Sequence, residues 1–153
     1  MKLRNEPAAE DLEAMRQWFR RLSECVQAVD FEAAHPLFAD DMIAFGTFTD
    51  FMVGREHAEA RQWRNVWPTI RRFRWRLDQV HGIVCADRLT GVGMAIFDSD
   101  GFREDGARFE RAGRATVSFA REAIDAPWVA THTHMSLVRG TPDRSHGQFS
   151  EPG

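Results

Sequence analysis

The chain of 153 residues contains no tyrosine and only two cysteines, Cys25 and Cys85. These cysteines form neither a C-x-x-C pair nor the framework of a secreted protein, so we expect free thiols in a reducing cytoplasm. No stretch approaches the roughly 18 consecutive apolar residues that a membrane span needs, and residues 1–10 carry no apolar run typical of a signal peptide. We therefore expect a cytoplasmic protein with no membrane partner.

Short motifs for phosphate, dinucleotide, serine-hydrolase or zinc chemistry are also absent: the sequence has no P-loop, G-x-G-x-x-G, G-x-S-x-G or H-E-x-x-H. The net charge of −3 argues against a nucleic-acid partner. A chain of this length buries about 68–70% of its unfolded surface and needs neither a disulfide nor a metal to fold. We expect one domain over residues 8–140, a polar tail over residues 141–153, and no cofactor.

The first half of the chain has the period of α-helices. A long amphipathic helix is indicated by apolar residues spaced three and four apart, namely Leu12, Met15, Phe19, Leu22, Val26 and Val29. Asp30 is placed to cap a short second helix over residues 31–35. A third helix is predicted over residues 55–66, after a turn at Gly54. Its inner face would carry Ala60, Trp63 and Trp67.

The second half changes from a period of 3.6 to a period of two, as where Phe73 and Trp75 alternate with arginines. Strands are predicted over residues 42–48, 73–77, 89–97, 108–120 and 128–138. Turns are predicted at Asp40-Asp41 and at Asp98-Ser99-Asp100-Gly101. Helices followed by antiparallel strands favour an α+β fold, with a curved sheet whose concave face is covered by the N-terminal helices.

Three segments carry a resemblance to a known family. They are Phe38-Ala39-Asp40-Asp41, with Gly54 opening a later helix, then residues 113–121, and then residues 128–136. The chain resembles the SnoaL-like domains of the nuclear transport factor 2-like superfamily, and its last segment is similar to the end of the calcium/calmodulin-dependent kinase II association domain. The resemblance implies a cone-shaped, cystatin-like fold, a pocket between sheet and helices, and a homodimer. It does not by itself imply one function.

The same resemblance argues against two specific chemistries. The kinase association domain would place pocket arginines on the last two strands, where this chain has Val117 and Met135, so an anion-binding pocket of that design is not expected. Ketosteroid isomerases of this fold use an aspartate base and a tyrosine donor. This chain has no tyrosine, and Gly46 stands at the position that matches the base. A cyclase, isomerase or hydratase that uses an Asp/His acid–base group remains open.

Pocket residues follow from the resemblance and from the alternation of the strands. The candidates are Trp18, Phe45, Asp50, Trp63, Trp67, Val117, Phe119, Thr133 and Met135, and Thr131 would share their face. Asp50 is either a pocket acid or a turn residue that bonds its own backbone. Trp63 and Trp67, one helical turn apart, form either an aromatic wall for a ligand or ordinary core.

His132 and His134 stand two apart on a predicted strand and share one face. They predict either a metal site, which would need further ligands, or part of an outward face that packs on a second copy. We favour the second interpretation and expect no metal. The candidates for this dimer face are Arg114, Thr116, Ser118, His132, His134 and Ser136.

A basic cluster, Arg61, Arg64, Arg71, Arg72, Arg74 and Arg76, surrounds Phe73 and Trp75. Alternation puts the two aromatic side chains opposite most of the arginines, so they cannot stack on bases there. We interpret the cluster as a solvated or inter-subunit face. Three functions remain open: a domain that binds a small, largely apolar molecule, a SnoaL-like enzyme with a buried Asp, Glu or His in its pocket, and a non-catalytic dimerisation or docking module.

Overall fold

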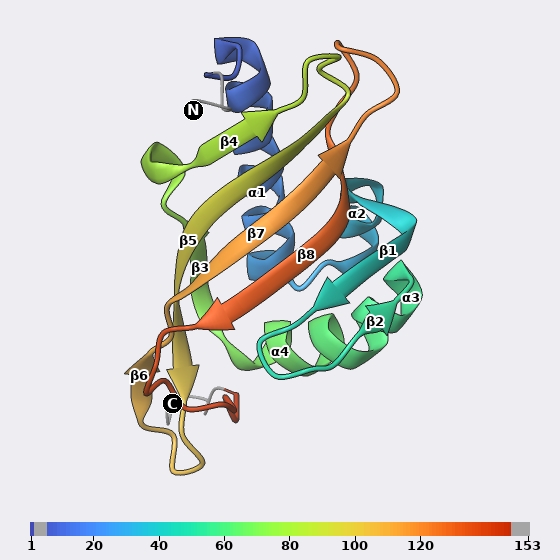
Figure 1. Cartoon of the computed structure of the whole chain (residues 1–153). Helices are drawn as coiled ribbons and strands as arrows, with labels where there is room; N and C mark the ends of the chain where they lie inside the picture. Colours follow the sequence, from blue (N-terminus) through green and yellow to red (C-terminus); the bar gives the residue numbers. More distant parts are fainter. Residues whose placement is uncertain (2–5, 148–153) are drawn as a thin grey trace.

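The computed structural model describes residue 1 and residues 6–147. Within them a curved eight-stranded sheet packs its concave face against the helices (Figure 1). The helices are α1 (Ala9–Ala28), α2 (Phe31–Ala34), α3 (Arg55–Ala58) and α4 (Arg64–Val66). The strands are β1 (Phe38–Phe45), β2 (Met52–Val53), β3 (Arg71–Trp75), β4 (His81–Val84), β5 (Thr90–Phe102), β6 (Arg108–Glu110), β7 (Gly113–Ala120) and β8 (Val129–Leu137). The α+β fold class is confirmed.

The sheet has the order β2-β1-β8-β7-β5-β3, with β4 and β6 each paired to β5 as well. Every pair is antiparallel except β1 with β8, which run parallel. The expectation of a purely antiparallel sheet is therefore wrong at this one pair. The parallel pair places the end of β1 beside Thr133 and His134 of β8.

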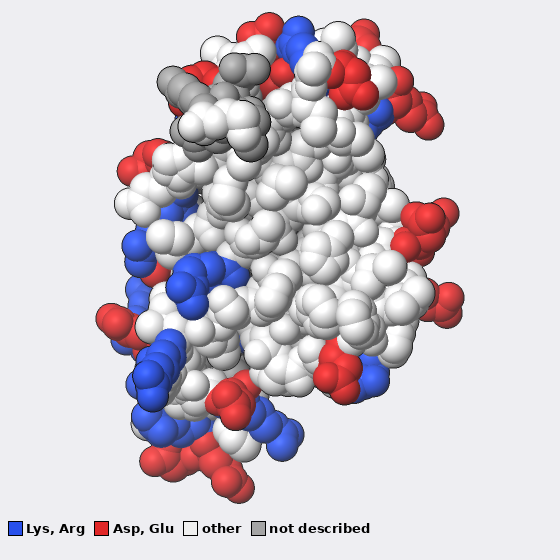
Figure 2. Space-filling view, in the orientation of Figure 1, with Lys and Arg blue, Asp and Glu red and all other residues white. Residues whose placement is uncertain are grey.

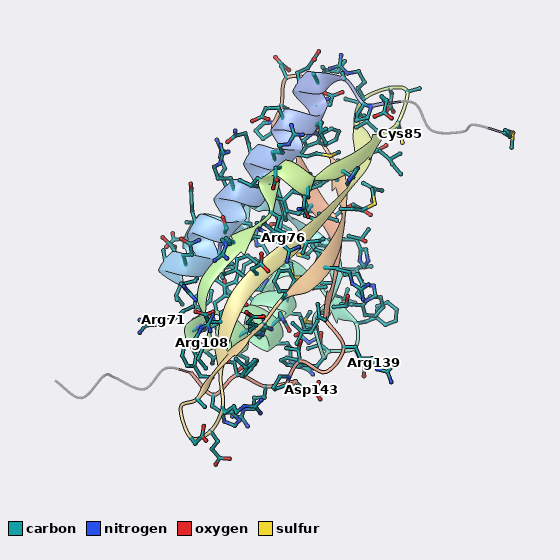
Figure 3. All side chains as sticks on the ribbon, turned by 90° about the vertical axis from the view of Figure 1, so that its left-hand side faces the viewer. Arg71, Arg76, Cys85, Arg108, Arg139 and Asp143 are labelled. Carbon is teal, nitrogen blue, oxygen red and sulfur yellow. The ribbon has the colours of Figure 1, made fainter. Side chains whose placement is uncertain are left out.

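Helix α1 lies across the concave face, as Figure 3 shows from the side. Its predicted stripe is buried at Met15, Phe19, Leu22 and Val26, and each such side chain contributes about 1.5–3 kcal/mol through burial. Val29 is not part of the buried stripe. It caps the helix in the left-handed conformation, with φ 52°, and is exposed.

An ion cluster around the buried Asp11 joins the start of α1 to the turn before β5 and to the end of β7. The Asp11 carboxylate, 1% exposed, accepts hydrogen bonds from Arg88 at 2.7 Å and from Arg121 at 2.5 Å. The Arg121 guanidinium also lies 4.0 Å from the centre of the Trp128 ring. The hydrogen bond from Arg88 is the largest of several causes that lower the pKa of Asp11. The carboxylate is thus fully paired, as burial of a charge requires.

The second helix begins as predicted, because the Asp30 carboxylate accepts a hydrogen bond from Ala33 N at 3.0 Å. The predicted third helix is wrong in its interior. Residues Glu59–Trp63 form a π-helical turn between α3 and α4. The wider turn shifts the inward side of the helix, so Ala60 is exposed and Gln62 is buried instead.

Both predicted aspartate turns are wrong. Asp40 and Asp41 lie within β1, which begins four residues earlier than expected, and Asp40 pairs with Arg55 at 2.7 Å. Residues Asp98 to Gly101 lie within β5, which runs on to Phe102.

Arginines of other segments explain why β5 continues through its two aspartates. Asp98 pairs with Arg76 at 2.9 Å, and Asp100 pairs with Arg72 at 2.6 Å and with Arg108 at 2.7 Å. These ion pairs offset the free-energy cost of placing two carboxylates on one strand. The turn falls later, where Arg103 N donates to Ala107 O.

Two short strands, β2 and β4, were not predicted. The expected strand over residues 108–120 is divided into β6 and β7 by Arg111 and Ala112. The chain is still held to β5 at this break. Arg111 N donates to Ser99 O at 2.8 Å, and Ser99 Oγ donates to Arg111 O at 2.7 Å. Arg111 therefore lies on the same buried row as Phe109 and Gly113, although it stands between β6 and β7.

The outer face of the sheet carries the polar residues expected there, because Arg114, Thr116 and Ser118 of β7 lie opposite Ser136, His134 and His132 of β8. Figure 2 shows this face to be largely free of charged side chains, which gather around its margin. Two members of the basic cluster, Arg71 and Arg76, lie on the side turned to the viewer in Figure 3, near Arg108 of β6.

The expected tail is partly anchored. Ser145 Oγ donates to Thr69 O and accepts from Phe102 N at 3.0 Å, and His146 N donates to Phe102 O at 2.8 Å. Residues 148–153 of that tail lie outside the described part of the chain. Within the described part, no helix is long and apolar enough to cross a membrane.

Candidate functional site

A small cavity of about 50 Å³ lies between the concave face of the sheet, the end of α1 and the helical segment 55–69. Apolar side chains form most of its wall, including Leu22, Val26, Val66, Phe73, Phe97 and Met135. A cavity of one probe sphere, about 10–15 Å³, holds one water, so this space accommodates only a few atoms without rearrangement.

Stacked aromatic rings form one side of the cavity. The rings of Trp63 and Trp67 lie 5.0 Å apart at 13° to each other. Trp67 also stacks on Phe31 at 5.2 Å, and Trp63 contacts Phe38 at 4.9 Å. The four-residue spacing that predicted an aromatic wall thus brings both tryptophans to the cavity, where each ring is fixed by a further aromatic neighbour.

Contacts outside the cavity hold the π-helical turn that bears Trp63. His35 Nε2 lies 2.6 Å from Glu59 Oε1, and Arg64 pairs with the other oxygen of Glu59 at 3.0 Å. The hydrogen bond from His35 is the largest cause that lowers the pKa of Glu59. Because π-helical turns occur often at functional sites, this turn favours a functional role for the segment Glu59–Trp63.

Two polar atoms at the cavity are buried without a hydrogen-bond partner among the described residues, namely Gln62 Oε1 and Thr47 Oγ1. The Gln62 side chain occupies the space beside Gly46, where an added Cβ would overlap with it. Gly46, the position that matches the base of the isomerases, therefore does line the cavity, and a neutral amide stands beside it. Either end of an amide bonds to a polar group, so Gln62 offers a donor or an acceptor.

Arg111 is the one positively charged residue among the described residues that line the cavity. It is 3% exposed, and its guanidinium has no ion-pair or hydrogen-bond partner among the described residues. Burial alone lowers its pKa to about 10. The guanidinium is thus still charged at neutral pH, in a position where nothing in the described chain compensates the charge.

The predicted pocket residues divide into two groups. Phe45, Trp63, Trp67, Thr133 and Met135 line the cavity. Trp18, Asp50, Val117 and Phe119 do not.

The second group lies elsewhere in the structure. Trp18 Nε1 donates to Leu37 O at 2.8 Å, and its ring packs on Phe119 at 5.0 Å, so both belong to the filled core. Val117 is fully buried, and Asp50 is exposed. Thr131 is also not in the cavity, because a bulge in β8 shifts the register there and its hydroxyl donates to Ser118 O at 3.2 Å.

None of the described cavity-lining residues is an aspartate, glutamate or histidine. His132 lies on the outer side, where its Nδ1 is 2.6 Å from Ile43 O. The Phe45 ring packs on both His132 and His134, at 5.9 and 5.2 Å. Within the described residues, no group of three or more potential metal ligands includes these histidines.

Sequence reasoning missed the two polar side chains Gln62 and Arg111. Gln62 could not be found, because an unbroken α-helix does not place it inward. Arg111 had a usable signal. The inward residues of β7, Gly113, Ala115 and Val117, continue backward with a step of two to Arg111. An arginine in an otherwise apolar inward row indicates a functional position.

Comparison with known proteins places the chain in a family. A family model for the SnoaL-like domain matches residues 12–140. No curated protein matches the chain.

Solved structures resemble this one over most of their length. A nuclear transport factor 2-like superfamily protein of Salmonella enterica has a TM-score of 0.70 at 15% identity, covering 88% of this chain and 95% of its own. A ketosteroid isomerase-like protein of Erwinia carotovora has a TM-score of 0.70 at 14% identity, covering 86% and 98%. The association domain of C. elegans CaMKII has a TM-score of 0.59 at 14% identity, covering 83% and 98%. At these identities the likeness shows the shared fold alone.

Proposed function

The chain belongs to the SnoaL-like domain family, and we propose that it binds a small, largely apolar molecule in the cavity between sheet and helices. One observation carries this proposal: the cavity is lined by the buried side chains of Arg111 and Gln62 and by the buried hydroxyl of Thr47, whose polar groups no described residue satisfies.

Such an arrangement is costly in a protein without a ligand. Protein interiors are close-packed, and more than about 90% of buried polar groups have a hydrogen-bond partner. Each unsatisfied group costs about 1–3 kcal/mol, and a charged one costs more. A bound molecule that fills the space and bonds to these groups removes the cost, which supports a binding site over an ordinary core.

Native mass spectrometry of freshly purified protein, followed by denaturation of the same sample, tests this proposal. We expect an organic species that is bound in the native spectrum and released on denaturation. Trp67→Ala, which removes one stacked ring of the wall, should reduce its occupancy at least tenfold. Ile124→Ala, at an exposed position, is the control and should retain it. Equal occupancy in wild type and Trp67→Ala would place the species elsewhere.

We further propose that the outer face of the sheet binds a second copy of the chain. Exposed apolar side chains lie at this face and beside its edge, with Val53 63% and Ile43 40% exposed. The face is largely uncharged (Figure 2), which suits a two-fold contact because like charges would otherwise meet. The CaMKII association domain, a structural neighbour, supports association as a role for this fold.

Light scattering after size-exclusion chromatography tests the dimer. Thr116→Arg puts a charge in the middle of the face, opposite His134, and should produce a monomer. Ala33→Arg, on the exposed surface of α2, should leave the mass unchanged. A dimer that survives Thr116→Arg would show that the chains associate through another surface.

The geometry gives an acid–base reaction no comparable support. The enzyme hypothesis required a buried Asp, Glu or His in the pocket, and the described lining residues supply none. The site is therefore better suited to binding than to proton transfer by its own side chains.

A further inference from the structure

We propose that the molecule bound in the cavity is a small organic carboxylate, or the carboxylate end of a longer apolar acid, held by the guanidinium of Arg111. This inference rests on the proposed binding function and adds the charge and chemical class of the ligand.

The contrast with Arg121 carries the argument. Both arginines are buried, at 3% and 8% exposure. Arg121 is compensated by the Asp11 carboxylate and by the Trp128 ring. Arg111 has neither kind of partner among the described residues. One of the two buried arginines thus has its counter-charge built into the protein, and the other has none and lines the cavity.

The two carboxylates of the neighbouring strand β5 are already paired. Asp98 and Asp100 of β5, which flank the Ser99 that pairs with Arg111, form ion pairs with Arg76, Arg72 and Arg108. Glu110, next to Arg111 in the chain, is exposed on the opposite face, and no described carboxylate forms an ion pair with Arg111. A counter-charge from a bound molecule would fill this place.

The cavity favours a carboxylate over an inorganic anion. A carboxylate accepts two parallel hydrogen bonds from the guanidinium fork and carries one charge, which one arginine balances. Phosphate would bring more charge and more oxygens into a wall that is mostly apolar, with Arg111 as its one cation among the described lining residues. The remaining polar groups, Gln62, Thr47 and Thr133, can bond to a hydroxyl or a second oxygen of the ligand.

The size of the cavity sets the scale of the ligand. About 50 Å³ suits an acetate- or propanoate-sized group between the rings. A longer or aromatic acid requires movement of the wall or extends through the mouth of the cavity. The probes should therefore include both short and aromatic acids.

The experiment compares each acid with its amide of the same shape, using ligand-free protein. The probes are acetate with acetamide, propanoate with propanamide, and benzoate with benzamide, together with inorganic phosphate, and binding is measured by calorimetric titration at pH 7. We expect at least one carboxylate to bind about tenfold to a hundredfold tighter than its amide, the range typical of a hydrogen bond to a charged group. Arg111→Met should abolish this preference, and Arg111→Lys should retain part of it. Arg139→Met, at an exposed position outside the cavity and the outer face, should leave it unchanged.

The outcomes separate the two proposals. Amides that bind as tightly as the acids, or a preference that survives Arg111→Met, would overturn the carboxylate assignment and leave the binding function in place. Phosphate binding tighter than every acid would overturn it as well. If no probe binds and native mass spectrometry finds no bound species, the binding function itself fails, and the carboxylate inference fails with it.

Discussion

Replacing Arg111 by methionine should make the ligand-free protein more stable, which is unusual for a buried position. The pKa of Arg111 falls well below the ordinary value of an arginine, to about 10, because the charged form is buried without a partner. A difference of this size corresponds to a cost of about 3 kcal/mol for holding the charged group in the fold at pH 7. Methionine keeps an unbranched stem in the same space and carries no charge, so we expect a gain of about 1–3 kcal/mol.

The sign follows from proton linkage. The pKa of Arg111 is lower in the folded state than in the unfolded state, so the cost is complete at every pH below about 10. It disappears only as the pH rises above about 10 toward the ordinary pKa of an arginine. The gain in Arg111→Met should therefore be constant across the neutral range, from pH 6 to 8.

Urea denaturation at pH 7 measures the effect. A shift of the midpoint to higher urea with an unchanged slope shows a gain in stability, and for a chain of this length it corresponds to about 2–4 °C in Tm per kcal/mol. Arg61→Met, at an exposed position, is the control and should stay within about 0.5 kcal/mol of wild type. Arg111→Met less stable than wild type by 1 kcal/mol or more would refute the view that Arg111 is an uncompensated charge.

Two further predictions concern the framework around the cavity. Asp11→Asn should cost about 3 kcal/mol in a urea titration, because it leaves the buried Arg121 and the partly exposed Arg88 without their carboxylate. The pKa of Asp11 is lowered, so its stabilisation is complete above about pH 4 and is lost as the pH falls further, and Asp11→Asn should lack this loss below pH 4. Gly113→Ala should cost about 1–3 kcal/mol, because the added Cβ overlaps with the Phe97 ring and the Ser136 carbonyl, and an unchanged thermal midpoint would contradict that packing.

The sequence predicted those parts of the fold that depend on strict local periods. The stripe of α1 followed from spacings of three and four. The two-residue period of β8 put Thr133 and Met135 on one face, and the family resemblance identified that face as the inward one. A shift by one residue would turn every side chain of a strand to the other face, so the pattern has only one consistent register.

The errors arose where residues distant in sequence decide the local structure. Asp98-Ser99-Asp100-Gly101 has the composition of a turn, yet Arg76 and Arg72, 22 and 28 residues away, pair with its carboxylates in an extended strand. The π-turn before Trp63 has no sequence signature of its own and rotates Gln62 inward. Local sequence propensity cannot predict the extended aspartate segment or the π-turn, because each depends on tertiary contacts.

The case of Arg111 differs from both errors, because the local pattern does predict that this residue lies on the inward row. Only its charge is at odds with the apolar residues of that row. A consistent sequence would put an apolar residue between Phe109 and Gly113 on the inward row, where Arg111 stands. Such a conflict between residue type and environment is expected at functional positions, where stability is exchanged for a specific interaction. If Arg111→Met both stabilises the ligand-free protein and abolishes the preference for carboxylates, the energy lost in folding and the energy gained in binding come from the same charge. A saturating carboxylate at a hundred times its Kd should then stabilise wild type by about 2.7 kcal/mol and leave Arg111→Met nearly unchanged.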